Sequence, residues 1–168
     1  FVRQRILPPK KKKPKTKRLT WGERARDPDW SPDGKTILFA AGSKGTDELK
    51  TYELASKKIA PFVSRAKPYT QFAQPRYSPD GSQIAALRFQ EGSPRRSASG
   101  AEAGWELCIA GADGKLIKKI PHESLAIVSR PTWTTDGSEV VYSSDEDGVS
   151  NLYAYNVATG TKKRLTNV

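Results

Sequence analysis

A short turn motif recurs three times in this chain, and its spacing constrains the fold more than any other feature. The motif reads WSPDG at residues 30–34, YSPDG at 77–81 and WTTDG at 133–137. The three Asp-Gly pairs lie 47 and 56 residues apart. A repeat at this interval is typical of chains built from several copies of one supersecondary unit. The sequence therefore predicts three related structural units rather than three unrelated turns.

The three copies share a proline, an aromatic residue, an aspartate and a glycine at matching positions. Asp and Gly adopt turn conformations with positive φ at low steric cost. In the third copy Thr134 and Thr135 replace Ser-Pro, so that turn lacks the constraint of a proline ring. We expect the aromatic residue to face the gap between neighbouring units, and Asp33 and its counterparts to be structural. The shared residues are Pro28, Trp30, Asp33 and Gly34; Pro75, Tyr77, Asp80 and Gly81; and Pro131, Trp133, Asp136 and Gly137.

Each motif is followed by the same succession of short apolar segments. In the first copy these segments read KTILFAA, ELKTYEL and KIAPFV, with polar turns between them. They are rich in β-branched and aromatic residues, and none shows a sustained 3.6-residue period. Together with the segment before the motif, they give four strands per copy. Four-stranded antiparallel units that repeat at this length are propeller blades, so the sequence predicts an all-β fold.

The combined pattern of these residues resembles the TolB-like β-propeller repeat. That repeat has an x-P-x-W-S-P-D-G turn, an apolar strand, an N-L-Y segment such as residues 151–153, and a D-G or T-G turn. The resemblance covers residues 21–168, and the same repeat occurs in the propellers of prolyl-oligopeptidase-like and tricorn-like proteases. It implies the fold but no single activity, because the family is defined by its scaffold. It also implies a bacterial setting, in the periplasm or otherwise outside the cytoplasm.

A partial match near the N-terminus predicts an incomplete additional blade. The tetrapeptide KRLT at 17–20 recurs at 163–166, where it closes the third unit. We therefore expect a partial β-propeller of about three and a half blades, whereas closed propellers have roughly 4 to 8. The predicted divisions are the last strands of an upstream blade with a basic turn (1–20), a blade (21–64), a blade with an inserted loop at 91–104 (65–121), and a blade (122–168). Such an arc is expected to be a fragment of a larger propeller, with bare apolar faces through which a homodimer could form.

The positive charge of the chain is concentrated at one end. The net charge is +11, yet residues 1–26 hold eleven of the basic residues and a single acid, Glu23. This segment could contact an anionic partner, either nucleic acid or an anionic membrane surface. It lacks interleaved aromatic residues for base stacking, so a solvated turn is the favoured interpretation and nucleic acid the less favoured partner. The candidate contacts are Lys10, Lys11, Lys12, Lys13, Lys15, Lys17 and Arg18.

Residues with catalytic or metal-binding chemistry are few. No G-x-S-x-G nucleophile elbow occurs, and His122 and Cys108 are the only histidine and cysteine. We expect Cys108 to be a buried apolar residue, since it lies in the apolar stretch WELCIA. The acidic DEDG turn at 145–148 lacks the later glutamate of a calcium loop and is expected to join the second and third strands of its unit. The sequence thus predicts no catalytic residue, no metal site and no cofactor, and no apolar run approaches the roughly 18 residues of a membrane span.

The favoured function is a non-catalytic scaffold that binds a protein or peptide partner. It would act through its loops and the mouth of the central channel, since loops on rigid scaffolds often carry binding function. The inserted loop at 91–104 is a candidate for a role specific to its blade. One alternative is the substrate-gating propeller domain of a peptidase whose catalytic domain lies outside this chain. A second alternative is nucleic-acid binding through the basic N-terminal turn.

Overall fold

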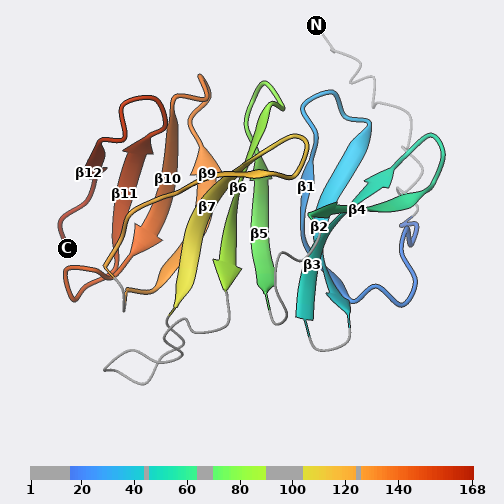
Figure 1. Ribbon diagram of the computed structural model, residues 1–168, viewed down its shortest axis with the longest axis horizontal. Helices are drawn as coiled ribbons and strands as arrows, with labels where there is room; N and C mark the ends of the chain where they lie inside the picture. The colour runs from blue at the N-terminus through green and yellow to red at the C-terminus, as the bar shows by residue number, and fades with distance from the viewer. Residues whose placement is uncertain (1–15, 44–45, 64–69, 90–103, 124–125) are drawn as a thin grey trace, which may run out of the picture.

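The structure is a set of three antiparallel β-sheets standing side by side. The computed structural model describes residues 16–43, 46–63, 70–89, 104–123 and 126–168 (Figure 1). Each sheet has four strands that pair in chain order, so each sheet is one blade. The first blade holds β1 (Ala25–Trp30), β2 (Thr36–Ser43), β3 (Thr46–Glu53) and β4 (Ile59–Val63). The second holds β5 (Gln71–Tyr77), β6 (Gln83–Phe89), β7 (Trp105–Gly111) and β8 (Leu116–Lys119), and the third β9 (Val128–Trp133), β10 (Glu139–Ser144), β11 (Asn151–Asn156) and β12 (Lys162–Arg164).

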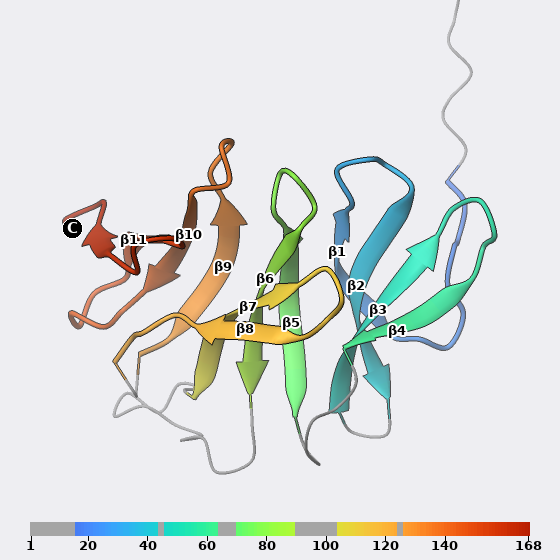
Figure 2. The same cartoon turned by 45° about the horizontal axis from the view of Figure 1, so that its top comes forward.

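The arrangement confirms the predicted all-β, partial-propeller fold. Figures 1 and 2 show the three blades following one another in chain order, with β1, β5 and β9 the first strand of each. The Asp-Gly turns join the first and second strands, and they lie at the same end as the β3–β4, β7–β8 and β11–β12 turns. This end is called the turn end below. Within the described residues, no helix has the length and apolar character needed to cross a membrane.

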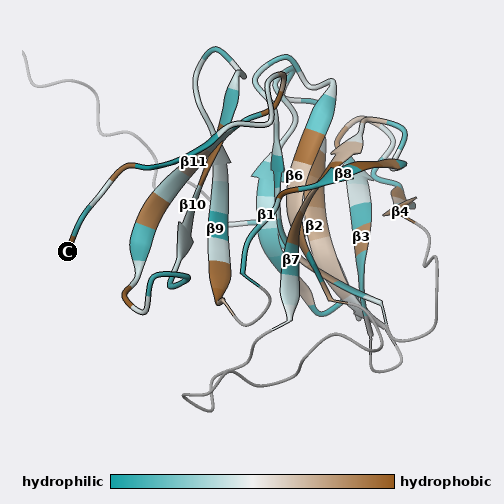
Figure 3. Ribbon diagram, turned by 60° about the vertical axis from the view of Figure 1, so that its left-hand side comes forward, coloured by the Kyte–Doolittle hydropathy of each residue, from teal (hydrophilic) through white to brown (hydrophobic). Residues whose placement is uncertain are grey.

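The hydrophobic core lies between the blades rather than inside any one of them. A blade is a single sheet, so it can bury its two faces only against its neighbours. Figure 3 shows the hydrophobic segments of β6 and β7 in the middle blade, which is covered on both sides. The first interface contains Leu38, Ala40 and Leu49 packed on Phe72, Ile84, Ala86 and Cys108. The second contains Ala73, Ala85, Leu87, Leu107, Ile109 and Ile120 packed on Val128, Val140, Tyr142, Tyr153 and Tyr155.

The faces at the two ends of the arc carry the same kinds of residue but leave them exposed. Leu49, Leu107 and Leu152 occupy equivalent places, opposite Ala40, Leu87 and Ser143 on the neighbouring strand. Leu49 and Leu107 are 1% and 0% exposed, whereas Leu152 on the last blade is 43% exposed. The neighbouring blade, and not the residue type, therefore decides burial at this position.

The N-terminal segment that was expected to close an upstream blade forms no strand where the structure describes it. Residues 16–20 are unpaired with any sheet, and Leu19 packs on the outer face of the first blade beside Phe39 and Ala41. The matching C-terminal segment does continue a sheet, because the Leu165 amide donates to the Leu152 carbonyl at 2.7 Å beyond the end of β12. Residues 1–15 and 90–103, which hold the rest of the predicted upstream strands and most of the predicted inserted loop, lie outside the described residues.

Truncation of equivalent leucines should separate covered from uncovered faces. Leu107→Ala removes a fully buried side chain between the second and third blades, so the free energy of unfolding should fall by about 2–5 kcal/mol. The matched variant Leu152→Ala, in the same place on the exposed face, should cost about 0.5 kcal/mol when both variants are measured at a concentration at which the chain is monomeric. Urea denaturation followed by circular dichroism measures both. Equal losses for the two variants would show that the blades do not stabilise one another in this way.

Candidate interaction surface

The three Asp-Gly turns are built from one repeated set of hydrogen bonds. In the first turn the Ser31 hydroxyl donates to the Asp33 carboxylate at 2.7 Å, and the Gly34 amide donates to the Ser31 carbonyl at 2.8 Å. The same bonds recur at Ser78 and at Thr134 in the other two turns. The third turn makes them without the proline, so the ring is not required for this geometry. The turn glycines have φ values of 68°, 73° and 71°, a region that other residues enter only with strain.

The turn aspartates are committed to these bonds. Hydrogen bonds from Ser78 and Ser82 lower the pKa of Asp80 to about 2, and bonds from Thr134 and Ser138 lower that of Asp136 to about 2. Bonds from Ser31 and Lys35 lower the pKa of Asp33 in the same direction. A carboxylate that is held ionised in this way is a poor general acid or base near neutral pH. The geometry gives these residues a structural role in the turns.

Successive turns also touch one another. A Cβ atom placed on Gly81 would lie 3.4 Å from Cδ of Pro32, the proline of the preceding turn. A Cβ atom on Gly137 would lie 3.5 Å from Cδ of Pro79 in the same relation. The aromatic residues complete the junctions: the Trp133 indole donates to the Arg76 carbonyl at 3.0 Å in the preceding blade. Trp30, which has no described blade in front of it, is 55% exposed.

A second repeated contact links the first strands of the blades. Asp27, Gln74 and Arg130 each precede the repeated proline, sit at a bulge and have φ between 50° and 54°. The backbone N–H of Gln74 donates to the Asp27 carboxylate at 3.2 Å, and the backbone N–H of Arg130 donates to the side-chain carbonyl oxygen of Gln74 at 2.6 Å. Each side chain thus caps the same backbone position of the next blade. An arginine has no acceptor atom, so Arg130 itself cannot extend this series.

Sequence reasoning missed this inter-blade ladder, although a signal was present. The three residues stand directly before the aligned prolines and are all polar. Their types differ, however, so they do not show up as a shared motif. Only the spatial stacking of the blades reveals that a carboxylate and an amide can accept the same hydrogen bond.

A groove of about 720 Å³ opens at the turn end between the second and third blades. The hydrogen-bonded turns at 78–82 and 134–138 line it, and so does Trp133. Ile117 lines it and is 53% exposed, while the neighbouring Lys118 ammonium donates to the Val157 carbonyl at 2.7 Å. A protein interface has an apolar centre with a polar rim, and the groove offers Ile117 and Trp133 beside the polar groups of the turns.

The basic segment is described only in part. Lys10, Lys11, Lys12, Lys13 and Lys15 lie outside the described residues, and Lys17 is exposed. The Arg18 guanidinium donates to the Thr20 carbonyl at 2.7 Å and stands 5.7 Å from the centre of the Trp21 ring. Arg18 therefore has local partners on its own segment.

The remaining candidate groups are engaged within the protein. His122 lies within hydrogen-bonding distance of the Glu123 carbonyl, and Cys108 is buried. The acidic turn joins β10 and β11, where Asp147 accepts from Tyr153 at 2.5 Å and Glu146 pairs with Lys162 at 2.6 Å. Across the described ranges, no group of three or more His, Cys, Asp or Glu side chains is placed to hold a metal ion.

Three four-stranded blades packed face to face, each opened by the same Asp-Gly turn, define a protein of the β-propeller class. A family model described as the TolB beta propeller domain matches residues 23–168. The chain belongs to this family, and the resemblance seen in the repeats is confirmed.

The relatives of the chain are considerably longer than the chain itself. A Tol-Pal system protein TolB from Anaeromyxobacter dehalogenans is 30% identical over 106 residues, which cover 63% of this chain and 21% of the relative. The crystal structure of TolB from Acinetobacter baumannii superposes with a TM-score of 0.63 at 24% identity, covering 88% of this chain and 34% of that one. A puromycin-hydrolyzing peptidase from Mycobacterium tuberculosis gives a TM-score of 0.67 at 19% identity, covering 88% and 24%. These two structures show a shared fold, and the chain spans about a fifth of the TolB relative.

Acid should weaken the turns through Asp80 and Asp136. Their folded-state pKa of about 2 lies below the ordinary value of 3.8, so the stability they contribute is complete above pH 4 and is lost as the pH falls toward 2. The double variant Asp80→Asn, Asp136→Asn should be less stable at pH 7 and should lose less stability between pH 4 and pH 2. Urea midpoints measured across this range test the sign. A Glu123→Gln variant controls for the loss of a negative charge, and a double variant as acid-sensitive as the unaltered chain would contradict the assignment.

Proposed function

We propose that this chain is part of a non-catalytic propeller scaffold that binds a protein or peptide partner at its turn end. The observation that carries the proposal is the groove between the second and third blades, which exposed Ile117 lines together with two hydrogen-bonded turns. A rigid wall lowers the entropic cost of binding, because few groups must be ordered when the partner arrives. The groove of about 720 Å³ has the size of a site for a short peptide segment or a projecting loop.

The relatives suggest where such a partner should be sought. The relative from Anaeromyxobacter dehalogenans is named as a Tol-Pal system protein, so we propose a Tol-Pal type assembly as the setting. The family resemblance supports the further proposal that the chain works in the bacterial periplasm or otherwise outside the cytoplasm. The alternatives, a peptidase-gating propeller and nucleic-acid binding through Lys17, Arg18 and the preceding lysines, stay predictions. A hydrolase motif in the longer parent chain would favour the first, and a steep salt dependence of duplex binding would favour the second.

Partner binding at the groove can be tested by replacing Ile117, its exposed apolar side chain, with a charged residue. Isothermal titration with the Tol and Pal proteins encoded in the same genome should detect a partner. Ile117→Asp should then weaken binding by about tenfold or more, because a carboxylate would be desolvated in the interface. Val149→Asp is the matched control, since Val149 is 51% exposed in the β10–β11 turn at the opposite end. Equal weakening by both variants, or by neither, would remove the groove from the proposal.

We also propose that the chain of 168 residues self-associates through its uncovered blade faces. Leu152 on the last blade and Trp30 on the first are 43% and 55% exposed, although their counterparts in covered blades are buried or half-buried. A second copy could cover such faces by the same packing that joins the blades. Size-exclusion chromatography with light scattering should give the mass of a dimer, and Leu152→Asp should restore a monomer. Leu54→Asp, at an exposed position in the β3–β4 turn, is the control, and a monomer from the unaltered chain would contradict self-association.

A further inference from the structure

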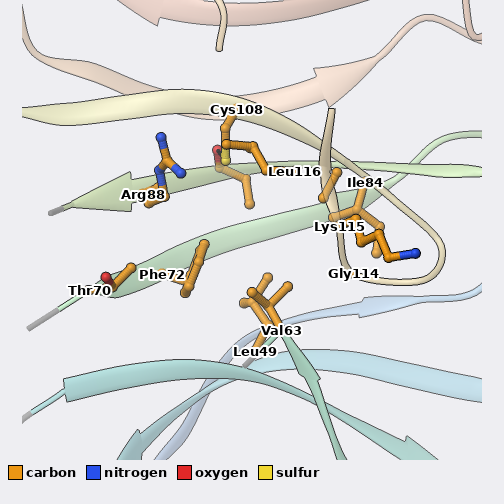
Figure 4. A pocket seen from close by; sticks show the side chains of 12 residues that line it. Leu49, Val63, Thr70, Phe72, Ile84, Arg88, Cys108, Gly114, Lys115 and Leu116 are labelled. Carbon is orange, nitrogen blue, oxygen red and sulfur yellow. Dashed lines mark hydrogen bonds between the residues drawn. The ribbon is translucent and has the colours of Figure 1, made fainter. Parts of the chain in front are cut away.

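A separate cavity of about 250 Å³ lies between the first and second blades. Figure 4 shows Leu49 and Val63 pointing into it from the first blade, with Phe72 and Cys108 facing them from the second. Its lining is mainly apolar. One wall is held close by the β7–β8 turn, where a Cβ atom on Gly114 would lie only 2.2 Å from the Phe62 carbonyl oxygen. The two blades therefore already approach closely beside the cavity.

The cavity exists because the second blade departs from the other two in side-chain size. In the third blade the equivalent face is filled by three tyrosines, which pack against the second blade. The strand registers show that smaller residues stand at these positions in the second blade. The pair Ala86 and Cys108 corresponds to the pair Tyr142 and Tyr153, and Ala110 corresponds to Tyr155. The first blade also carries a tyrosine, Tyr52, at the position of Ala110. Close packing is the rule in protein interiors, so a gap of this size is an exception at this interface.

A buried arginine reaches into this cavity. Arg88 is 9% exposed and lines the cavity, whereas the equivalent residues of the other blades are Ala41 and Ser144. One guanidinium nitrogen donates to Glu106 at 2.9 Å, and the buried Nε has no hydrogen-bond partner. A buried donor without a partner is costly, and a charged one more so. This repeat position therefore holds an arginine whose burial costs free energy, although the other two blades pack with a small residue there.

The described groups beside Arg88 are a carboxylate and a second cation. Glu106 lies between Arg88 and the Lys119 ammonium, so one carboxylate faces two cations. These two cations lower the pKa of Glu106 against the opposing effect of burial. Cys108 adds no negative charge, because burial raises the pKa of its thiol to about 12, and the thiol donates to the Ala86 carbonyl at 3.3 Å. Arg88 and Lys115 are the charged side chains among the described residues that line this apolar cavity, so the cavity is complementary to an apolar molecule with a negative charge.

We propose that the cavity between the first and second blades binds a small aliphatic carboxylate, with its chain among Leu49, Phe72 and Cys108 and its carboxylate on Arg88. The carboxylate accepts the hydrogen bond that Nε lacks, and the aliphatic chain fills the space that tyrosines fill in the third blade. This site is independent of the groove at the turn end. It requires only that the first two blades pack as described.

Octanoate, octan-1-ol and octylammonium are the probes that test the proposal on the unaltered chain. They share a chain length and differ in charge, so only the charged contact separates them. Isothermal titration should show saturable binding of one octanoate, about tenfold or more tighter than octan-1-ol, with octylammonium the weakest. Equal affinities for octanoate and octan-1-ol, or no saturable octanoate binding, would overturn the proposal without any substitution.

Two variants locate the binding. Arg88→Met should lower octanoate affinity about tenfold and leave octan-1-ol binding within twofold, whereas Arg164→Met in the third blade should change neither. Ala110→Tyr restores the residue type of the other two blades and should abolish binding of both probes. Circular dichroism checks that each variant is folded. Unchanged octanoate affinity in folded Ala110→Tyr would place binding elsewhere and overturn the proposal.

The single cysteine gives an independent readout of position. Cys108 lines the cavity, so saturating octanoate should slow its modification by methyl methanethiosulfonate, measured by mass spectrometry, at least about fivefold. Octanoate bound to the exposed end faces would leave this rate unchanged. That outcome, together with measurable octanoate binding, would assign the probe to an adventitious surface and would contradict the proposed site.

Discussion

Every part of this structure depends on the packing of one blade against the next. A single four-stranded sheet has two faces, and the largest buried side chains of the chain come from both. The middle blade is covered on each side, and its Leu107 and Ile109 are fully buried. The end blades carry comparable residues on faces that stay open, as Leu152 shows. Burial in this fold is thus a property of the stack, and stability approximates a sum of blade and interface contributions.

Two repeated polar contacts orient this apolar stack. At the turn end, each serine or threonine hydroxyl donates to its aspartate, and Pro32 and Pro79 occupy the space beside the glycine of the following turn. Between the first strands, Asp27 and Gln74 accept from the backbone of the following blade. Hydrophobic packing is not directional, whereas these hydrogen bonds specify register and angle. The result is an end built from hydrogen-bonded turns, two of which line the groove between the second and third blades.

The positions that break the repeat are as informative as those that keep it. The second blade has small residues where the third has tyrosines, and an arginine where its neighbours have Ala41 and Ser144. Residues that are alike in all three blades maintain the shared scaffold. Buried residues that differ between the blades create space and charge that the scaffold alone does not need. The cavity beside Arg88 lies where the second blade departs from the repeat in this way.

The sequence by itself determined the fold class, the four-strand unit and the places of the turns, because periodicity, strand composition and Asp-Gly chemistry are local properties of the chain. It also determined that Cys108 would be buried and that residues 145–148 would form a turn. Only the tertiary structure decided that Leu152 is exposed while Leu107 is buried, that Gln74 caps Arg130, and that Arg88 faces a cavity beside Cys108. These features join residues that lie far apart along the chain, and they depend on how blades stack. Identical repeat positions therefore acquire different environments, which no local pattern records.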